Sequence, residues 1–112
     1  MLGYISPKVP QVEVTNLHDA IKAHENFVLL DVRTQGEYAK ERIKGSINLP
    51  VDKISEQIEK IITDKNTKIY VYCLSGSRSI IAAKTLIDLG YKNIFDVKNG
   101  LLAWRVNYYP TV

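Results

Sequence analysis

The chain is poor in cysteine. Its 112 residues include one cysteine, Cys73, and also one tryptophan and one methionine. A single cysteine excludes an internal disulfide and any metal site built from several cysteines. This usage fits a reducing compartment, so we expect the protein in the cytoplasm.

Long apolar runs and clustered charge are also missing. No apolar segment approaches the roughly 18 residues that a membrane span needs. Residues 1–11 lack the features of a secretory signal, and Pro7 and Pro10 interrupt them, so we expect an extended N-terminal arm. The 15 basic and 12 acidic residues give a net charge of +3 without a run of one sign. Nothing therefore indicates a nucleic-acid partner or a membrane partner.

Strand and helix patterns alternate along the chain. The hydrophobic content of 46% and the length fit one domain over residues 1–112. We expect an α/β fold whose sheet is mainly parallel. The predicted strands cover residues 12–14, 27–30, 46–49, 69–72 and 94–97, and the predicted helices begin near residues 15, 34, 53, 80 and 101.

Several residues predict where the helices begin and end. Thr15 or Asn16 is expected to cap the first helix, and Asp52 the third. Thr34 and Glu37 have the spacing of a capping box, which predicts a short helix to about Glu41. Gly90 is expected just past the end of the fourth helix, and Trp104 is interpreted as a packing anchor. The fourth helix is apolar around much of its circumference, which predicts extensive burial.

Asp31 and Arg33 follow the predicted strand of residues 27–30. Ligands of open α/β sheets bind at the carboxyl ends of the strands, so both residues are candidates for a supporting role in a site. The alternative is a purely local structural network. Arg33 and Glu37 are four residues apart and could form an ion pair.

The segment around Cys73 is the strongest functional signal. Cys73 stands where a predicted strand meets Leu74, Ser75, Gly76, Ser77, Arg78 and Ser79, which precede a predicted helix. Backbone N–H groups of such a loop, together with the helix dipole, favour an anion and hence the thiolate. Gly76 permits a positive φ, and Arg78 adds a permanent charge. The alternative for a lone cysteine is a buried small hydrophobe.

The spacing of the loop indicates which anion it fits. Four residues separate Cys73 from Arg78, one fewer than in the tyrosine-phosphatase signature. The smaller ring suits one extra sulfur atom on the cysteine, a persulfide, better than a phosphoryl group. The spacing therefore favours sulfur chemistry over phosphate chemistry.

The chain resembles the single-domain rhodaneses, a family of sulfurtransferases, from about Val12 to Pro110. The resemblance is carried by ordered blocks: Asp31-Val32-Arg33, Glu37-Tyr38, Ile43-x-Gly45-Ser46-x-Asn48, Cys73-x-x-Gly76-x-Arg78-Ser79, Gly100 and Trp104. Two positions depart from the family pattern. Arg42 stands where a histidine is common, and Asn99-Gly100 replaces a common Gly-Gly pair. We expect Arg42 to affect local packing more than chemistry, and Asn99 to tolerate a left-handed conformation.

The resemblance implies a five-stranded parallel sheet with helices on both faces. It also implies a two-step transfer in which Cys73 takes a sulfur atom from a donor such as thiosulfate and passes it to a thiol or cyanide. Residues Leu74 to Ser79 would hold the persulfide, and Arg78 would help to bind the donor. No cofactor is expected beyond the covalent persulfide. Expected partners are a small sulfur donor and a thiol acceptor, with thioredoxin, glutathione or a cysteine desulfurase as examples.

Two other functions remain open on this fold. One is a non-catalytic interaction or regulatory module, against which the presence of Cys73 and Arg78 speaks. The other is a phosphatase, against which the short loop speaks.

Overall fold

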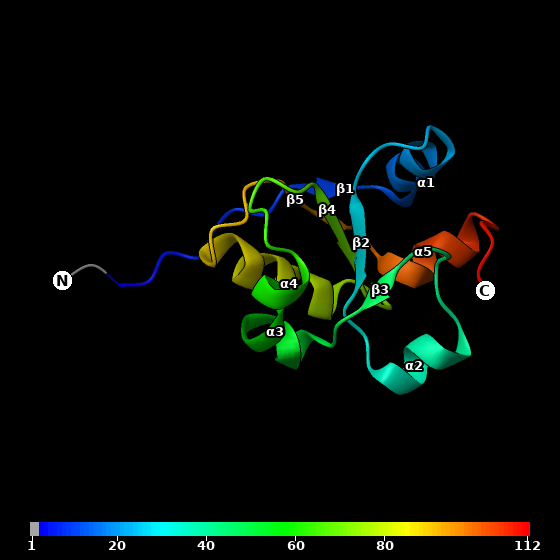
Figure 1. The fold of residues 1–112 in the computed structure, drawn as a ribbon. Helices are drawn as coiled ribbons and strands as arrows, with labels where there is room; N and C mark the ends of the chain where they lie inside the picture. The colour runs from blue at the N-terminus through cyan, green and yellow to red at the C-terminus, as the bar shows by residue number, and fades with distance from the viewer. Residues whose placement is uncertain (1–2) are drawn as a thin grey trace.

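The computed structural model describes residues 3–112, and its centre is a parallel β-sheet. Within these residues five strands pair in the order β1-β5-β4-β2-β3, and every pairing is parallel (Figure 1). The expected α/β fold with a five-stranded sheet is therefore confirmed. The strands are β1 (Gln11–Val12), β2 (Val28–Asp31), β3 (Ile47–Asn48), β4 (Ile69–Tyr72) and β5 (Ile94–Val97).

Helices cover both faces of the sheet. The α3 and α4 helices pack on one face, and α1 and α5 pack on the other (Figure 1). The short α2 lies beside the edge of the sheet that carries β3. The helices are α1 (Val14–Lys22), α2 (Gln35–Lys40), the 3-10 turn η1 (Val51–Lys53), α3 (Ile54–Ile61), α4 (Ser77–Asp88) and α5 (Gly100–Val106).

The central strands are buried because both of their faces meet a helical layer. All four residues of β4 are buried, as a continuous run of β-branched and aromatic side chains predicts. Successive side chains of β4 point to opposite faces of the sheet and therefore belong to two separate parts of the core. Val71 joins the cluster under α3 and α4, whereas Tyr70 and Tyr72 join the cluster under α1 and α5. Trp104 is 2% exposed in this second cluster, so its role as a packing anchor is confirmed.

Two of the predicted caps are wrong. Glu13 caps α1 through a box in which its N–H donates to Asn16 Oδ1 at 3.0 Å, so neither Thr15 nor Asn16 is the capping residue. This earlier start also places Val14 in the helix rather than in the strand. Asp52 lies within η1, and Lys53 precedes α3.

The capping box of α2 is confirmed. Glu37 N–H donates to Thr34 Oγ1 at 3.2 Å, and Thr34 N–H donates to Glu37 Oε1 at 3.1 Å. Gly90 follows α4 with a φ of +98°, as expected. Most of α4 is buried or half-buried, as its apolar character predicts, but Ile81 is 56% exposed.

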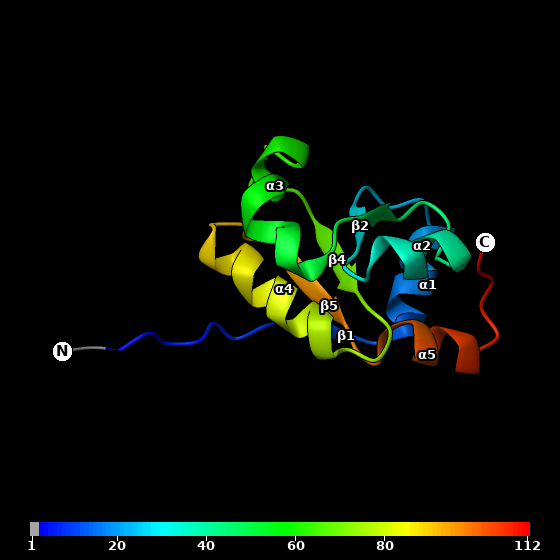
Figure 2. The ribbon, with the colours of Figure 1, turned by 90° about the horizontal axis from the view of Figure 1, so that it is seen from below.

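The N-terminal arm leads away from the body as an irregular trace (Figure 2). The expected arm of residues 1–11 ends at Pro10, since Gln11 already pairs with β5, and Met1 and Leu2 lie outside the described residues. Across residues 3–112, no helix has the length and apolar character required to cross a membrane.

Candidate active site

Cys73 lies at the carboxyl end of β4, in the connection that leads into α4. The connection is short because α4 begins at Ser77, earlier than the apolar pattern predicted. Gly76 precedes the helix with a φ of +109°, a conformation that glycine adopts without a steric penalty. The sequence allows this residue either a positive φ or a close backbone approach, and the structure shows the positive φ. The connection turns back beside the start of α5 (Figure 2).

The Cys73 sulfur accepts hydrogen bonds from the loop. Gly76 N–H donates to Sγ at 3.1 Å, and Ser79 N–H donates to it at 3.3 Å. The thiol donates in turn to Ser79 Oγ at 3.5 Å, and that hydroxyl donates to the carbonyl of Gly76 at 3.2 Å. Backbone donors directed at one sulfur stabilise negative charge on it.

Cys73 is also part of the core. It is 0% exposed and belongs to the apolar cluster under α3 and α4. The residue therefore packs in the apolar core while its sulfur accepts backbone N–H donors. Ser75 and Ser77, in the connection that follows Cys73, are exposed.

The start of α5 supports the loop from behind. Leu101 N–H donates to the carbonyl of Cys73 at 2.9 Å, and Leu102 N–H donates to that of Leu74 at 3.0 Å. Asn99 adopts the left-handed conformation expected of it, with a φ of +61°. Since the first N–H groups of a helix have no intrahelical acceptor, α5 uses its own free donors to fix the Cys73 loop.

Arg78 is held by a glutamate from a distant part of the chain. Its Nη1 donates to Glu37 Oε1 at 2.6 Å, and its Nη2 donates to Glu37 Oε2 at 3.0 Å. The hydrogen bonds from Arg78 lower the pKa of Glu37 from 4.5 to about 2, with further lowering from Thr34 against the opposing effect of burial. The predicted pair of Arg33 with Glu37 is wrong, because Arg78 occupies this carboxylate. The sequence places Glu37 in a capping box and carries no local signal of its contact with Arg78.

Asp31 and Arg33 form a buried ion pair at the end of β2. Asp31 Oδ2 accepts from Arg33 Nη2 at 2.7 Å, and Asp31 Oδ1 accepts from Arg33 N–H at 3.0 Å. Both residues are nearly inaccessible, at 0% and 2% exposure. The guanidinium also donates to the carbonyl of Glu41 at 2.5 Å. These contacts are those of a purely local structural network, the alternative that the sequence leaves open for both residues.

Other polar groups form hydrogen bonds near the Asp31–Arg33 pair, at the carboxyl end of the strands. Asn48 Nδ2 donates to the carbonyls of Asp31 at 3.0 Å and Arg33 at 2.9 Å. Tyr72 Oη accepts from Ile43 N–H at 3.1 Å, and burial first of all raises the pKa of Tyr72 above its usual value. Arg42, which replaces the histidine common in the resembled family, lies 4.9 Å from the centre of the Tyr38 ring. This contact agrees with the expected effect of Arg42 on packing.

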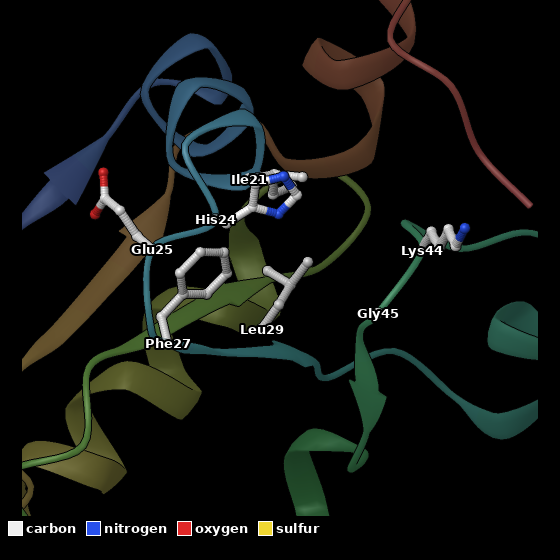
Figure 3. A pocket seen from close by; sticks show the side chains of 7 residues that line it. All are labelled: Ile21, His24, Glu25, Phe27, Leu29, Lys44 and Gly45. Carbon is white, nitrogen blue, oxygen red and sulfur yellow. The ribbon is translucent and has the colours of Figure 1, made fainter.

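Two surface hollows flank the sheet at opposite ends. One has a volume of about 500 Å³ and lies where β2 and β3 end; it is lined by Thr34, Gln35, Gly36, Asn48, Leu49, Pro50, Asp52, Lys53 and Gln57. This is the same sheet edge that carries Cys73. The other has a volume of about 340 Å³ and lies between the end of α1 and the start of β2. Figure 3 shows Phe27 and Leu29 under Ile21 and His24, with Lys44 to the side.

Neither hollow is lined by a residue of the Cys73 loop. Within residues 3–112, no group of three or more His, Cys, Asp or Glu side chains is placed to hold a metal ion.

Comparison with known proteins identifies the family. The family model for the rhodanese-like domain matches residues 13–107. The chain is 29% identical over 104 residues to a sulfurtransferase of Allochromatium vinosum, and the match covers 93% of this chain and 95% of that protein. It is 33% identical over 86 residues to the thiosulfate sulfurtransferase GlpE of Coxiella burnetii, with 77% and 78% covered.

A solved structure agrees with these matches. The rhodanese-related protein of Thermoplasma volcanium is 35% identical and superimposes with a TM-score of 0.80, over 92% of this chain and 97% of that one. Some relatives are longer, since the chain spans about half (51%) of the length of YrkF from Bacillus subtilis. The extent of the family match, together with the named activity of these relatives, makes this chain a member of the rhodanese family and a rhodanese-type sulfurtransferase.

Proposed function

We propose that Cys73 carries sulfur as a persulfide from a sulfane-sulfur donor, thiosulfate or another persulfide source, to a thiol or cyanide acceptor. The supporting observation is the position of Cys73 Sγ, which accepts N–H groups from Gly76 and Ser79 inside a tight loop. Covalent catalysis of this kind divides one transfer into two easier steps.

In the first step the Cys73 thiolate attacks the outer sulfur of the donor. With thiosulfate, the new S–S bond forms as the bond between the outer sulfur and the sulfonyl sulfur breaks, and sulfite leaves with the electron pair. In the second step the acceptor attacks the terminal sulfur of the persulfide. Cyanide becomes thiocyanate, or a thiolate becomes a persulfide, and the Cys73 thiolate is restored.

The loop offers donors for the added sulfur. Ser77 and Arg78 are the first two residues of α4, so their N–H groups have no intrahelical acceptor. These groups join those of Gly76 and Ser79 in a loop from Leu74 to Ser79 that suits a terminal persulfide anion. Asp31 and Arg33 support the site indirectly, because their ion pair fixes the end of the neighbouring strand β2.

The test is the intact mass of the protein through one cycle. Incubation with thiosulfate should add one sulfur atom, and later addition of cyanide should remove it and release an equal amount of thiocyanate. Cys73→Ala should show neither change, which serves as the matched control. An unchanged mass with thiosulfate, with methanethiosulfonate and with an alkyl persulfide would contradict the proposal, and Cys73-dependent release of phosphate from p-nitrophenyl phosphate would indicate a phosphatase instead.

A further inference from the structure

We propose that Glu37 is a positioning residue that sets the charge of the preferred sulfur donor. This role rests on the persulfide cycle proposed above. Glu37 neutralises the charge of Arg78. The site therefore prefers donors with one negative charge, such as thiosulfonates and alkyl persulfides, to the thiosulfate dianion.

Arg78 and Glu37 form a bidentate ion pair. Both terminal nitrogens of Arg78 donate to Glu37, one to each carboxylate oxygen, at 2.6 and 3.0 Å. Glu37 is itself fixed, because Thr34 donates to its Oε1 from the backbone at 3.1 Å and from the side-chain hydroxyl at 3.1 Å. A bidentate pair with an anchored carboxylate holds the guanidinium in one orientation.

The pair also persists across the pH range of an assay. The pKa of Glu37 falls to about 2, and the hydrogen bonds that Arg78 donates to Glu37 raise the pKa of Arg78 above its usual value. The negative charges of Cys73 and Asp31 also contribute to this rise, so Arg78 lies within the electrostatic field of the reacting sulfur.

Apart from Arg78, the loop that follows Cys73 carries no positively charged side chain. Leu74, Ser75 and Ser77 are neutral, and Arg33 is paired with Asp31 at 2.7 Å. A donor therefore meets backbone N–H groups, the helix dipole and the Arg78–Glu37 pair, whose formal charges cancel. A second negative charge raises the free energy needed to remove water from the donor, and the site, within the described residues, offers no unpaired cation to offset it. The dianion should therefore bind more weakly than a monoanion.

Two small donors isolate the effect of charge. Thiosulfate is a dianion and methanethiosulfonate is a monoanion, yet each gives its outer sulfur to a thiolate and releases a sulfur oxyanion, sulfite or methanesulfinate. In Glu37→Gln the amide keeps an acceptor for Arg78 but removes the negative charge. We expect KM to fall about threefold for methanethiosulfonate and about tenfold for thiosulfate, because attraction to the unmasked Arg78 scales with donor charge. The kcat for either donor should change less than about twofold.

Glu41→Gln is the matched control. Glu41 pairs with Arg105 and accepts from Thr111 at 2.8 Å, and among residues 3–112 its side chain forms no hydrogen bond or ion pair with the Cys73 loop. This variant should leave both KM values unchanged. Adding Arg78→Gln to Glu37→Gln should abolish the gain for thiosulfate. Equal changes in KM for both donors, or a higher KM for thiosulfate in Glu37→Gln, would overturn the inference.

A second measurement needs no variant. Since the paired site has little net side-chain charge, the ratio of the two KM values in the unmodified protein should stay within about twofold between about 20 and 300 mM NaCl. A thiosulfate KM that rises steeply relative to that of methanethiosulfonate would show a free cation and refute the inference. Loss of the persulfide with both donors would refute the proposed cycle instead, so the two failures are distinguishable.

Discussion

Gly100, at the start of α5, lies so near the Cys73 loop that a side chain has no room. A Cβ atom at this position would lie 2.2 Å from the carbonyl oxygen of Cys73 and 2.9 Å from that of Leu74. Both neighbours are backbone atoms, which cannot rotate away as a flexible side chain would. The same two carbonyls accept hydrogen bonds from α5, so a larger residue would push apart the contact that fixes the loop.

We therefore expect Gly100→Ala to lower the free energy of unfolding by about 2–4 kcal/mol and to reduce sulfur transfer. Urea denaturation and the rate of thiocyanate formation would measure the two effects. Gly90→Ala is the control, because Gly90 has a φ of +98° but no atom within 4 Å of its would-be Cβ. This variant should lose about 1 kcal/mol from backbone strain alone and keep its activity. Equal losses in the two variants would contradict the proposed clash.

Helix α2 connects the site to the pH dependence of stability. It is only six residues long, and its capping box and the ion pair from Glu37 to α4 stabilise it. The folded-state pKa of Glu37, about 2, lies below its usual value of 4.5. The stabilisation from ionised Glu37 is therefore fully present above about pH 4.5 and is lost as the pH falls toward about 2.

Glu37→Gln tests this contribution. Both side chains of the pair are 31% exposed, so solvent screening should reduce the stabilisation to about 1–2 kcal/mol, below what the full pKa shift implies. Urea unfolding at several pH values should show a difference between the original protein and the variant that is largest near neutral pH and shrinks below about pH 4.5. A difference that stays constant down to pH 2 would show that the loss arises from packing rather than charge.

The strands were predictable from the sequence to within about two residues. β2, β4 and β5 begin or end within one residue of the predicted positions, because buried parallel strands form continuous apolar runs. The capping box at Thr34 was also local enough to predict. The start of α1 was not, because Glu13 fills a capping position where serine, threonine or aspartate is usual.

The partners of charged residues were less predictable. Oppositely charged residues four apart form ion pairs when both lie in one helix, but Arg33 precedes α2, which begins at Gln35. Arg33 pairs instead with Asp31. Glu37 and Arg78 are 41 residues apart, and only the folded sheet edge brings them together. The sequence shows that Gly76 can adopt a positive φ, whereas it does not show that Glu37 pairs with Arg78.

At the scale of the whole molecule, the two ends of the described chain are anchored very differently. Near the N-terminus, Tyr4 is 72% exposed and its hydroxyl donates to Asp88 at 2.6 Å. At the other end, Val112 exchanges two backbone hydrogen bonds with Arg42, at 2.9 and 3.0 Å. The last residues therefore connect α5 to the segment that follows α2.

The contacts of the C-terminal residues also reach the core. Trp104 Nε1 donates to the carbonyl of Pro110 at 2.9 Å, and Thr111 Oγ1 donates to Glu41 at 2.8 Å. Removal of Pro110 would leave the indole N–H of a residue that is only 2% exposed without its acceptor. An unsatisfied buried donor costs more than the net value of an ordinary hydrogen bond.

A variant that ends at Tyr109 should consequently lose about 2–4 kcal/mol of unfolding free energy, as it forfeits four hydrogen bonds of which one satisfies a buried group. A variant that begins at Pro7 should differ from the full chain by no more than about 0.5 kcal/mol, because it removes one exposed side-chain contact among the described residues. Urea unfolding followed by far-UV circular dichroism would compare them. If the two truncations cost the same, the C-terminal residues would not act as the clamp that their contacts with Arg42, Trp104 and Glu41 indicate.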